Sequence, residues 1–294
     1  MIELNPLHPR EPGKEDSKEE ASASKEEALE AEDPVEAVDR VLESFGFGLY
    51  QKRLCVLNGA LWMADSMEVS LLSFLYECVG ASFGLTPAKA ATIVSVVFIG
   101  ELVGAVFAGP VADAYGRRPV SIAAAWTVAV FGLLTAVAPT FETLVACRCA
   151  VGVAVGSLAV PVDAMAETLP KERRGSQLTV IEFAWAAGAI YAAGASWATR
   201  RYGWRYLVLA CSLPFVFVAI AVTCLVDESP KWLARQGDLT KALAVLKKIA
   251  RANGKPLDLE DQHLLNNNSG VVGHHREQQQ QQEQQQQQEL EQQE

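Results

Sequence analysis

Two acidic residues, Asp65 and Glu68, lie within a segment, 54–76, that contains no other charged residue. They are three positions apart, so in a helix they share one face. An apolar surrounding favours the neutral form of a carboxyl group, and a carboxylate at the middle of a bilayer costs about 2.5–3.5 kcal/mol. We therefore expect this pair to face a water-filled cavity or a basic partner and to take up protons. The alternative is a pair that neighbouring polar groups merely satisfy.

Three more charged residues lie within apolar segments and extend this candidate proton-coupling and substrate site. Arg148 is the natural counter-charge for the acidic pair. Glu101 and Glu182 either line the same cavity or each make a single polar contact. Both interpretations of these two glutamates stay open.

The elements that must position these residues are six apolar segments, each close to the roughly 20 residues that a bilayer-crossing helix needs. They cover 54–77, 91–112, 119–138, 143–165, 177–199 and 206–226. A large soluble helical protein is the alternative, but the links are too short to provide it with a polar surface. The sequence predicts an all-α membrane protein with six transmembrane helices.

The link between the second and third segments, GPVADAYGRRP at 109–119, is the most specific motif of the chain. Gly109 and Gly116 allow close packing and a left-handed turn. Asp113 can accept hydrogen bonds from Arg117 and Arg118 in a partly dry interface. The alternative is an ordinary tight turn with basic residues beside it.

Written as G-x-x-x-D-x-x-G-R-R, this link resembles the loop between spans two and three of the major facilitator superfamily. Three further motifs resemble that family's fourth span, its next loop, and the segment after span six of its sugar-porter-like members: Arg148-x-x-x-Gly152-x-x-x-Gly156, Glu167 with Pro170, Arg173, Arg174 and Gly175, and Glu228-Ser-Pro-Lys-Trp-Leu233. Segment 46–75 looks most like the branch that contains the synaptic vesicle proteins. The resemblance covers about 35–256 and only the first half of a usual member, so it implies the N-terminal bundle of a major facilitator fold.

The resemblance also implies roles for single residues. Asp65 falls where proton-coupled members carry a first-span Asp, and Arg148 falls where they carry the Arg that pairs with it. Protonation of Asp65 would release Arg148 and bias the side to which the cavity opens. Glu68 has no such counterpart and is expected to contact a cationic substrate.

By the same resemblance, a set of residues at one end of the bundle locks the inner gate: Gly109, Asp113, Gly116, Arg117, Arg118, Glu167, Arg173 and Arg174. Two positions depart from the family pattern. Ala114 stands where many members have a basic residue, which weakens the lock slightly, and Asp227 stands where sugar porters have Pro. The second difference argues against a sugar porter.

Polar segments at both ends of the chain mark the limits of the predicted membrane region. We expect a disordered acidic leader (1–34), a cytoplasmic amphipathic helix (35–53), the six-span bundle (54–226), a cytoplasmic helical segment (227–256) that Asp238 starts and Gly254 stops, and a disordered Gln/Glu-rich tail (257–294). Nine Lys and Arg residues in the links on the leader's side, against four on the other, favour both termini in the cytoplasm. The target membrane is not encoded in any recognisable signal.

The function that follows is secondary transport of a small organic solute, coupled to protons and working by alternating access. Since the chain encodes one six-helix half, transport would need a homodimer or a related chain as the second half. The alternative is a non-transporting truncated or regulatory protein, or an incomplete gene model of a twelve-span transporter.

The sequence contains no nucleophile with a base, no phosphate loop and no metal-ligand cluster, so we expect neither an enzyme nor a cofactor or metal. Partners are membrane lipid, solute and proton. The net charge of −10 argues against nucleic acid.

Overall fold

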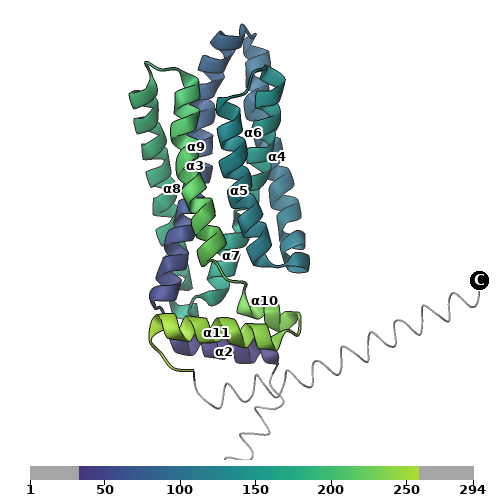
Figure 1. The fold of residues 1–294 in the computed structure, drawn as a ribbon, viewed down its shortest axis with the longest axis vertical. Helices are drawn as coiled ribbons and strands as arrows, with labels where there is room; N and C mark the ends of the chain where they lie inside the picture. Colours follow the sequence, from purple (N-terminus) through teal and green to yellow (C-terminus); the bar gives the residue numbers. More distant parts are fainter. Residues whose placement is uncertain (1–32, 258–294) are drawn as a thin grey trace, which may run out of the picture.

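The computed structural model describes residues 33–257, which form ten helices, α2 to α11. The predicted leader up to residue 32 and the predicted tail from residue 258 lie outside the described residues. Long helical rods stand side by side, and a layer of shorter helices covers one of their ends (Figure 1). That end is called the covered end below.

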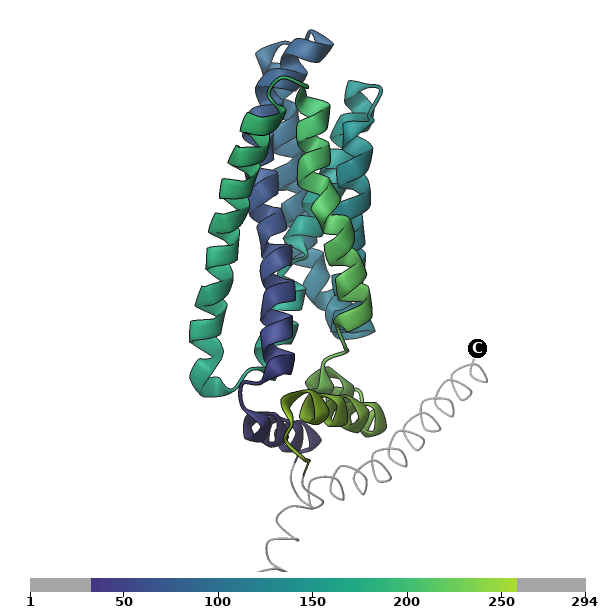
Figure 2. The ribbon, with the colours of Figure 1, turned by 60° about the vertical axis from the view of Figure 1, so that its left-hand side comes forward.

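The rods are α3 (Leu49–Phe83), α4 (Pro87–Tyr115), α5 (Arg117–Ala136), α6 (Phe141–Gly156) with α7 (Ala159–Thr168), α8 (Lys171–Thr199) and α9 (Trp204–Leu225). Five of the six are long and apolar enough to cross a membrane, with α6 and α7 counted together. α3 is outside this set although it is the longest, since its apolar run is interrupted by Asn58, Asp65 and Glu68. It nevertheless runs along α8 and α9 within the bundle (Figure 2). Helices are therefore found at all six predicted segments.

The fourth predicted span differs from a single helix, because it breaks between α6 and α7 at Ser157 and Leu158. Pro161 explains the break. Its ring has no N–H to donate to the carbonyl of Ser157, four residues earlier, and would collide with that carbonyl in a continuous helix. The Ser157 carbonyl accepts a hydrogen bond from Val160 N instead, at 3.2 Å.

Glycines bring α4 and α6 into direct backbone contact. A Cβ added at Gly104 would lie 2.1 Å from the carbonyl oxygen of Val153, and one at Gly156 would lie 2.1 Å from that of Glu101. Small residues at such positions let membrane helices approach closely. This packing fixes the position of α6, and with it that of Arg148.

The covering layer consists of α2 (Pro34–Phe45), α10 (Pro230–Arg235) and α11 (Leu239–Asn253). α2 and α11 lie across the ends of the rods (Figure 1). Their apolar faces share a second core, which includes Val38, Leu42 and Leu246. The predicted start and stop of α11 are confirmed, since Asp238 accepts a hydrogen bond from Lys241 N and Gly254 is left-handed with φ of 66°. α2 ends at Phe45, so residues 46–48 separate it from α3.

Ion pairs fasten α2 to the rest of the covered end. Lys231 of α10 is buried, and its Nζ lies 2.6 Å from Asp39 Oδ1. Lys171, at the start of α8, lies 2.9 Å from Glu43 Oε1. Burial by itself would raise the pKa of Asp39, but the hydrogen bond and charge of Lys231, together with the charge of Lys171, hold that pKa below its usual value of 3.8.

We expect Asp39→Asn to lower the free energy of unfolding by about 1–2 kcal/mol at neutral pH, because Lys231 then lacks its carboxylate. Since the folded-state pKa of Asp39 is depressed, the stabilisation is complete above the unfolded-state pKa and is lost as the pH falls through the folded-state pKa. Denaturation in detergent should therefore separate variant and parent at neutral pH and bring them together at about pH 2. Glu36→Gln, an exposed acid on the same helix, is the control. A difference that persisted unchanged in acid would contradict the assignment.

Candidate functional site

A buried ion pair lies at the centre of the bundle. Arg148 of α6 is fully buried, and its Nη1 forms a salt bridge with Oε1 of Glu68 on α3, which is 7% exposed. Its Nε donates a hydrogen bond to Thr135 Oγ1 of α5 at 3.1 Å. The pair therefore links three helices, and it is the reason why a charged side chain can lie inside the bundle.

The predicted partner of Arg148 was wrong in one respect, because Glu68 and not Asp65 makes the ion pair. Asp65 accepts a hydrogen bond from Trp185 Nε1 of α8 at 2.9 Å instead. The rotation of α3 decides between the two acids. Glu68 lies on the buried face with Ala64 and Leu71, whereas Asp65 is partly exposed and turned toward α8.

The other acidic residues lie near Asp65 and Glu68 but do not reach Arg148. Glu101 of α4 is close enough to Asp65 and Glu68, and Glu182 of α8 is close enough to Asp65, for their negative charges to repel. Oε1 of Glu101 is buried and has no hydrogen-bond partner among the described residues. Glu182 is exposed. Together with Asp65, these two residues form an acidic face between α4 and α8.

The interior beside Glu68 has little free space. A cavity of about 10 Å³ is lined by Glu68, Gly132, Cys211 and Ser212, among others. That volume is at the lower limit for a single water molecule. The space beside Glu68 is therefore too small for a solute. Within residues 33–257, no three His, Cys, Asp or Glu side chains gather as metal ligands would.

A second polar group, here called the Arg117 cluster, lies at the covered end and comprises Asp113, Arg117, Glu167, Glu228 and Ser229. Nη1 of Arg117 lies 2.7 Å from Asp113 Oδ1, and its Nη2 lies 3.1 Å from Glu167 Oε1. The other carboxylate oxygen of Glu167 accepts a hydrogen bond from Ser229 Oγ. The cluster thus ties α4, α5, α7 and the segment after α9 to one another.

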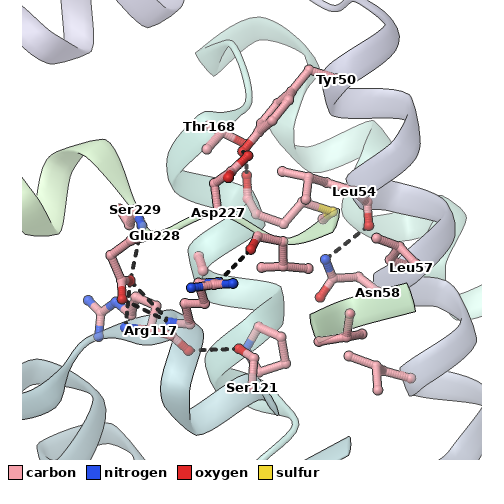
Figure 3. Close-up of a pocket in the computed structure, with 17 residues that line it drawn as sticks. Tyr50, Leu54, Leu57, Asn58, Arg117, Ser121, Thr168, Asp227, Glu228 and Ser229 are labelled. Atoms are coloured by element: carbon pink, nitrogen blue, oxygen red, sulfur yellow. Dashed lines mark hydrogen bonds between the residues drawn. The ribbon is translucent and has the colours of Figure 1, made fainter. Parts of the chain in front are cut away.

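Glu228 caps α5 from the far end of the chain. Its Oε1 accepts hydrogen bonds from the backbone N–H groups of Arg117, at 2.8 Å, and Arg118, at 3.1 Å (Figure 3). Negative charge at a helix N-terminus offsets the positive end of the helix dipole. Gly116 makes the approach possible, since it has φ of 108° and a Cβ there would lie 2.4 Å from Glu228 Oε2.

The Arg117 cluster does not include Arg118, Arg173 or Arg174, which the sequence predicted for the gate. Arg118 turns away from Asp113 and donates to the carbonyls of Val226, at 2.8 Å, and Thr223, at 3.2 Å. Arg174 donates to Leu169 O at 3.4 Å, and Arg173 is exposed.

The prediction of close packing at Gly109 was also wrong. This residue lies inside α4, where a Cβ would meet nothing within 4 Å. α4 continues to Tyr115, so the turn before α5 is the single residue Gly116.

We expect Glu228→Ala to lower the free energy of unfolding by about 1–2 kcal/mol, since two N–H groups at the start of α5 lose their acceptor. Glu228→Gln keeps an acceptor oxygen but not the charge, so its loss should be smaller. Chemical denaturation in detergent measures both. Glu142→Ala removes an acid from the first turn of α6, where Thr140 already caps the helix, and should change little. Equal losses for all three variants would contradict the capping role.

Four contacts of these sites could not be predicted from the sequence, namely those made by Glu228, Ser229, Thr135 and Trp185. Glu228 and Ser229 belong to a motif that was recognised, but their partners lie more than 60 residues away. Thr135 and Trp185 carry no local signal, because a single Thr or Trp in an apolar helix is unremarkable until the helices are placed.

Comparisons with known proteins agree with this architecture. The family model described as "Sugar (and other) transporter" matches residues 36–291. A synaptic vesicle 2-related protein of Xenopus laevis is 36% identical over 224 residues, which are 76% of this chain and 40% of that protein. An organic cation/carnitine transporter 7 of Arabidopsis thaliana is 36% identical over 217 residues, which are 74% of this chain and 43% of that protein.

Solved structures show the same fold. The xylose transporter XylE from E. coli, in a partially occluded inward-open conformation, superposes with a TM-score of 0.62 at 20% identity. The match covers 77% of this chain and 60% of the XylE chain. The chain spans less than half the length of the curated relatives named above. The match corresponds to about the N-terminal half of the fold. The chain is therefore an integral, multi-pass membrane protein that belongs to the sugar (and other) transporter family of the major facilitator superfamily.

Proposed function

We propose that this chain forms one half of a proton-coupled carrier that moves a small organic solute by alternating access. The buried Arg148–Glu68 pair is the observation that supports this most strongly. A buried charge is costly unless an opposite charge is paired with it. Proton binding to Glu68 would neutralise one partner, and the freed guanidinium would then favour a different packing of α3 against α6.

The Arg117 cluster is the gate in this proposal. It joins four segments by ion pairs and hydrogen bonds at the covered end, so these segments cannot separate while the cluster is intact. Opening toward that side requires the contacts of Arg117 to break. In the closed state they hold the carrier open to the opposite side. The excess of Lys and Arg at the covered end supports a cytoplasmic orientation of this end and of both termini.

The acidic face between α4 and α8 is the proposed solute site, and a second six-helix half would close it. α4 and α8 are the least buried of the five apolar spans, and they carry Glu101 and Glu182. This exposure supports a second copy or a related chain as the partner. The negative charge of the face favours cationic or neutral solutes over anionic ones.

The relatives suggest solutes for a first test. Their names include a carnitine and a niacin transporter, and XylE is a xylose transporter. The experiment is uptake of radiolabelled carnitine, niacin and xylose into proteoliposomes, with and without an inward proton gradient. We expect the gradient to accelerate uptake of one of them, and Glu68→Gln to abolish that acceleration. Glu77→Gln, an exposed acid on the same helix, should leave it intact. Gradient-independent uptake, or none of any solute, would contradict the proposal.

A second candidate is a non-transporting chain that binds and regulates another transporter half. The exposure of α4 and α8, which leaves a surface for another transporter half, favours it. Absence of uptake, together with stable co-purification of a differently tagged copy or of a family member from the same membrane, would select this candidate.

A further inference from the structure

A cavity lies between the covered end and the middle of the bundle, and the proposed transport cycle gives it no role. Its volume is about 20 Å³. It is lined by apolar side chains, among them Leu57, Leu61 and Met165, and by polar and charged ones that include Asn58, Ser121 and Asp227. Figure 3 shows the labelled ones around the cavity. It is separate from the smaller cavity beside Glu68, with which it shares no lining residue.

Asn58 of α3 presents an unpaired acceptor at this cavity. The side chain is only 4% exposed, and its Oδ1 has no hydrogen-bond partner among the described residues. Its Nδ2 donates to the carbonyl of Leu54 at 3.0 Å, one turn earlier. Exchanging the two amide atoms would set an oxygen against that carbonyl, so the observed orientation is the favourable one. A buried amide oxygen without a partner is unfavourable.

Two polar groups of α5 line the same cavity. Ser121 is 1% exposed and donates its proton to Arg117 O at 2.8 Å, so its oxygen can still accept. Arg118 also lines the cavity, but it is exposed and its Nε and Nη2 donate to backbone carbonyls of Val226 and Thr223. Asn58 and Ser121 extend into the same space from two helices (Figure 3).

We infer that this cavity is a binding site for a water molecule that joins Asn58 Oδ1 on α3 to Ser121 Oγ on α5. The volume exceeds the roughly 10–15 Å³ that one water needs, and the site offers the two to four polar partners that hold a buried water. The water donates one hydrogen bond to each of these two oxygens.

The site connects the two polar groups described above. Asn58 lies two turns before Asp65 on α3, and Ser121 lies one turn after the N-terminus of α5 that Glu228 caps. The bound water is therefore a hydrogen-bonded link between the acid-bearing helix and the Arg117 cluster. Asn58 is a positioning residue in this link.

Radiolytic hydroxyl labelling of the intact protein in detergent tests for the water directly, because radicals formed from a bound water oxidise the side chains beside it. Met165 lines the cavity and is 1% exposed, so bulk solvent does not reach it. We expect rapid oxidation of Met165 in the parent and a drop of about tenfold in Asn58→Leu, which keeps the volume but removes the acceptor. Ser66→Ala removes another buried unpaired oxygen of α3 that does not line this cavity, and should leave the labelling unchanged.

A dry cavity, seen as an unlabelled Met165 in the parent, would overturn the inference, as would equal labelling in Asn58→Leu. A double-mutant cycle between Asn58→Leu and Ser121→Ala tests the link independently of labelling. If one water joins both residues, the two losses of stability are non-additive. Additive losses, with the same additivity for Asn58→Leu and Ser66→Ala, would exclude a shared water. Neither measurement depends on transport.

Discussion

Replacing Arg148 by Met is expected to lower the free energy of unfolding by about 3–5 kcal/mol, because it leaves the Glu68 carboxylate buried without a counter-charge. The loss exceeds that of an ordinary core substitution, since Thr135 Oγ1 also loses the hydrogen bond that it accepts from the guanidinium. Chemical denaturation in detergent micelles measures it. Arg148→Lys keeps the charge but cannot make both contacts, so it should fall between the parent and Arg148→Met.

The double variant Arg148→Met with Glu68→Met separates the pair from the packing. Replacing both charges by apolar groups removes the uncompensated carboxylate, and most of the lost stability should return. Transport should not return, because the proposed proton acceptor is gone. Should the double variant be as unstable as Arg148→Met alone, an isolated charge would not be the cause of the loss. The pair would then have to stabilise the bundle by packing.

Gly104→Ala is expected to lower the free energy of unfolding by about 1–3 kcal/mol, because a methyl group there has no room. Its Cβ would lie 2.1 Å from the carbonyl oxygen of Val153, which belongs to a helix backbone and cannot rotate away. α4 and α6 would have to separate along their whole contact. Since α6 carries Arg148, the same change should weaken the Arg148–Glu68 pair and slow any proton-driven uptake.

Gly194→Ala provides the matched control for that change. Gly194 is also a helical glycine in an apolar span, but a Cβ there would meet nothing within 4 Å. Its thermal unfolding midpoint in detergent should stay close to that of the parent. If both alanine variants unfolded alike, loss of glycine flexibility and not the close approach of α4 to α6 would explain the effect.

The elements of this protein could be predicted from the sequence because their signals are local. Long apolar runs set the spans, Asp238 and Gly254 set the ends of α11, and the motif at 109–119 marked the Arg117–Asp113 contact. Each of these depends on residues within one segment or in one short link. Their physical cause, hydrophobicity or capping of neighbouring backbone groups, needs no knowledge of other helices.

The partners across helices were decided by the tertiary structure. Asp65 and Glu68 are one turn apart on α3, and the sequence could not say which of them faces α6, since that depends on how far α3 is rotated by its packing against α8 and α9. The capping of α5 by Glu228 likewise joins residues 111 positions apart. Sequence therefore determined which segments form helices in a membrane and which charges they carry. Packing alone determined which charges meet, because a rotation of a helix by less than one turn exchanges the side chains on its buried face.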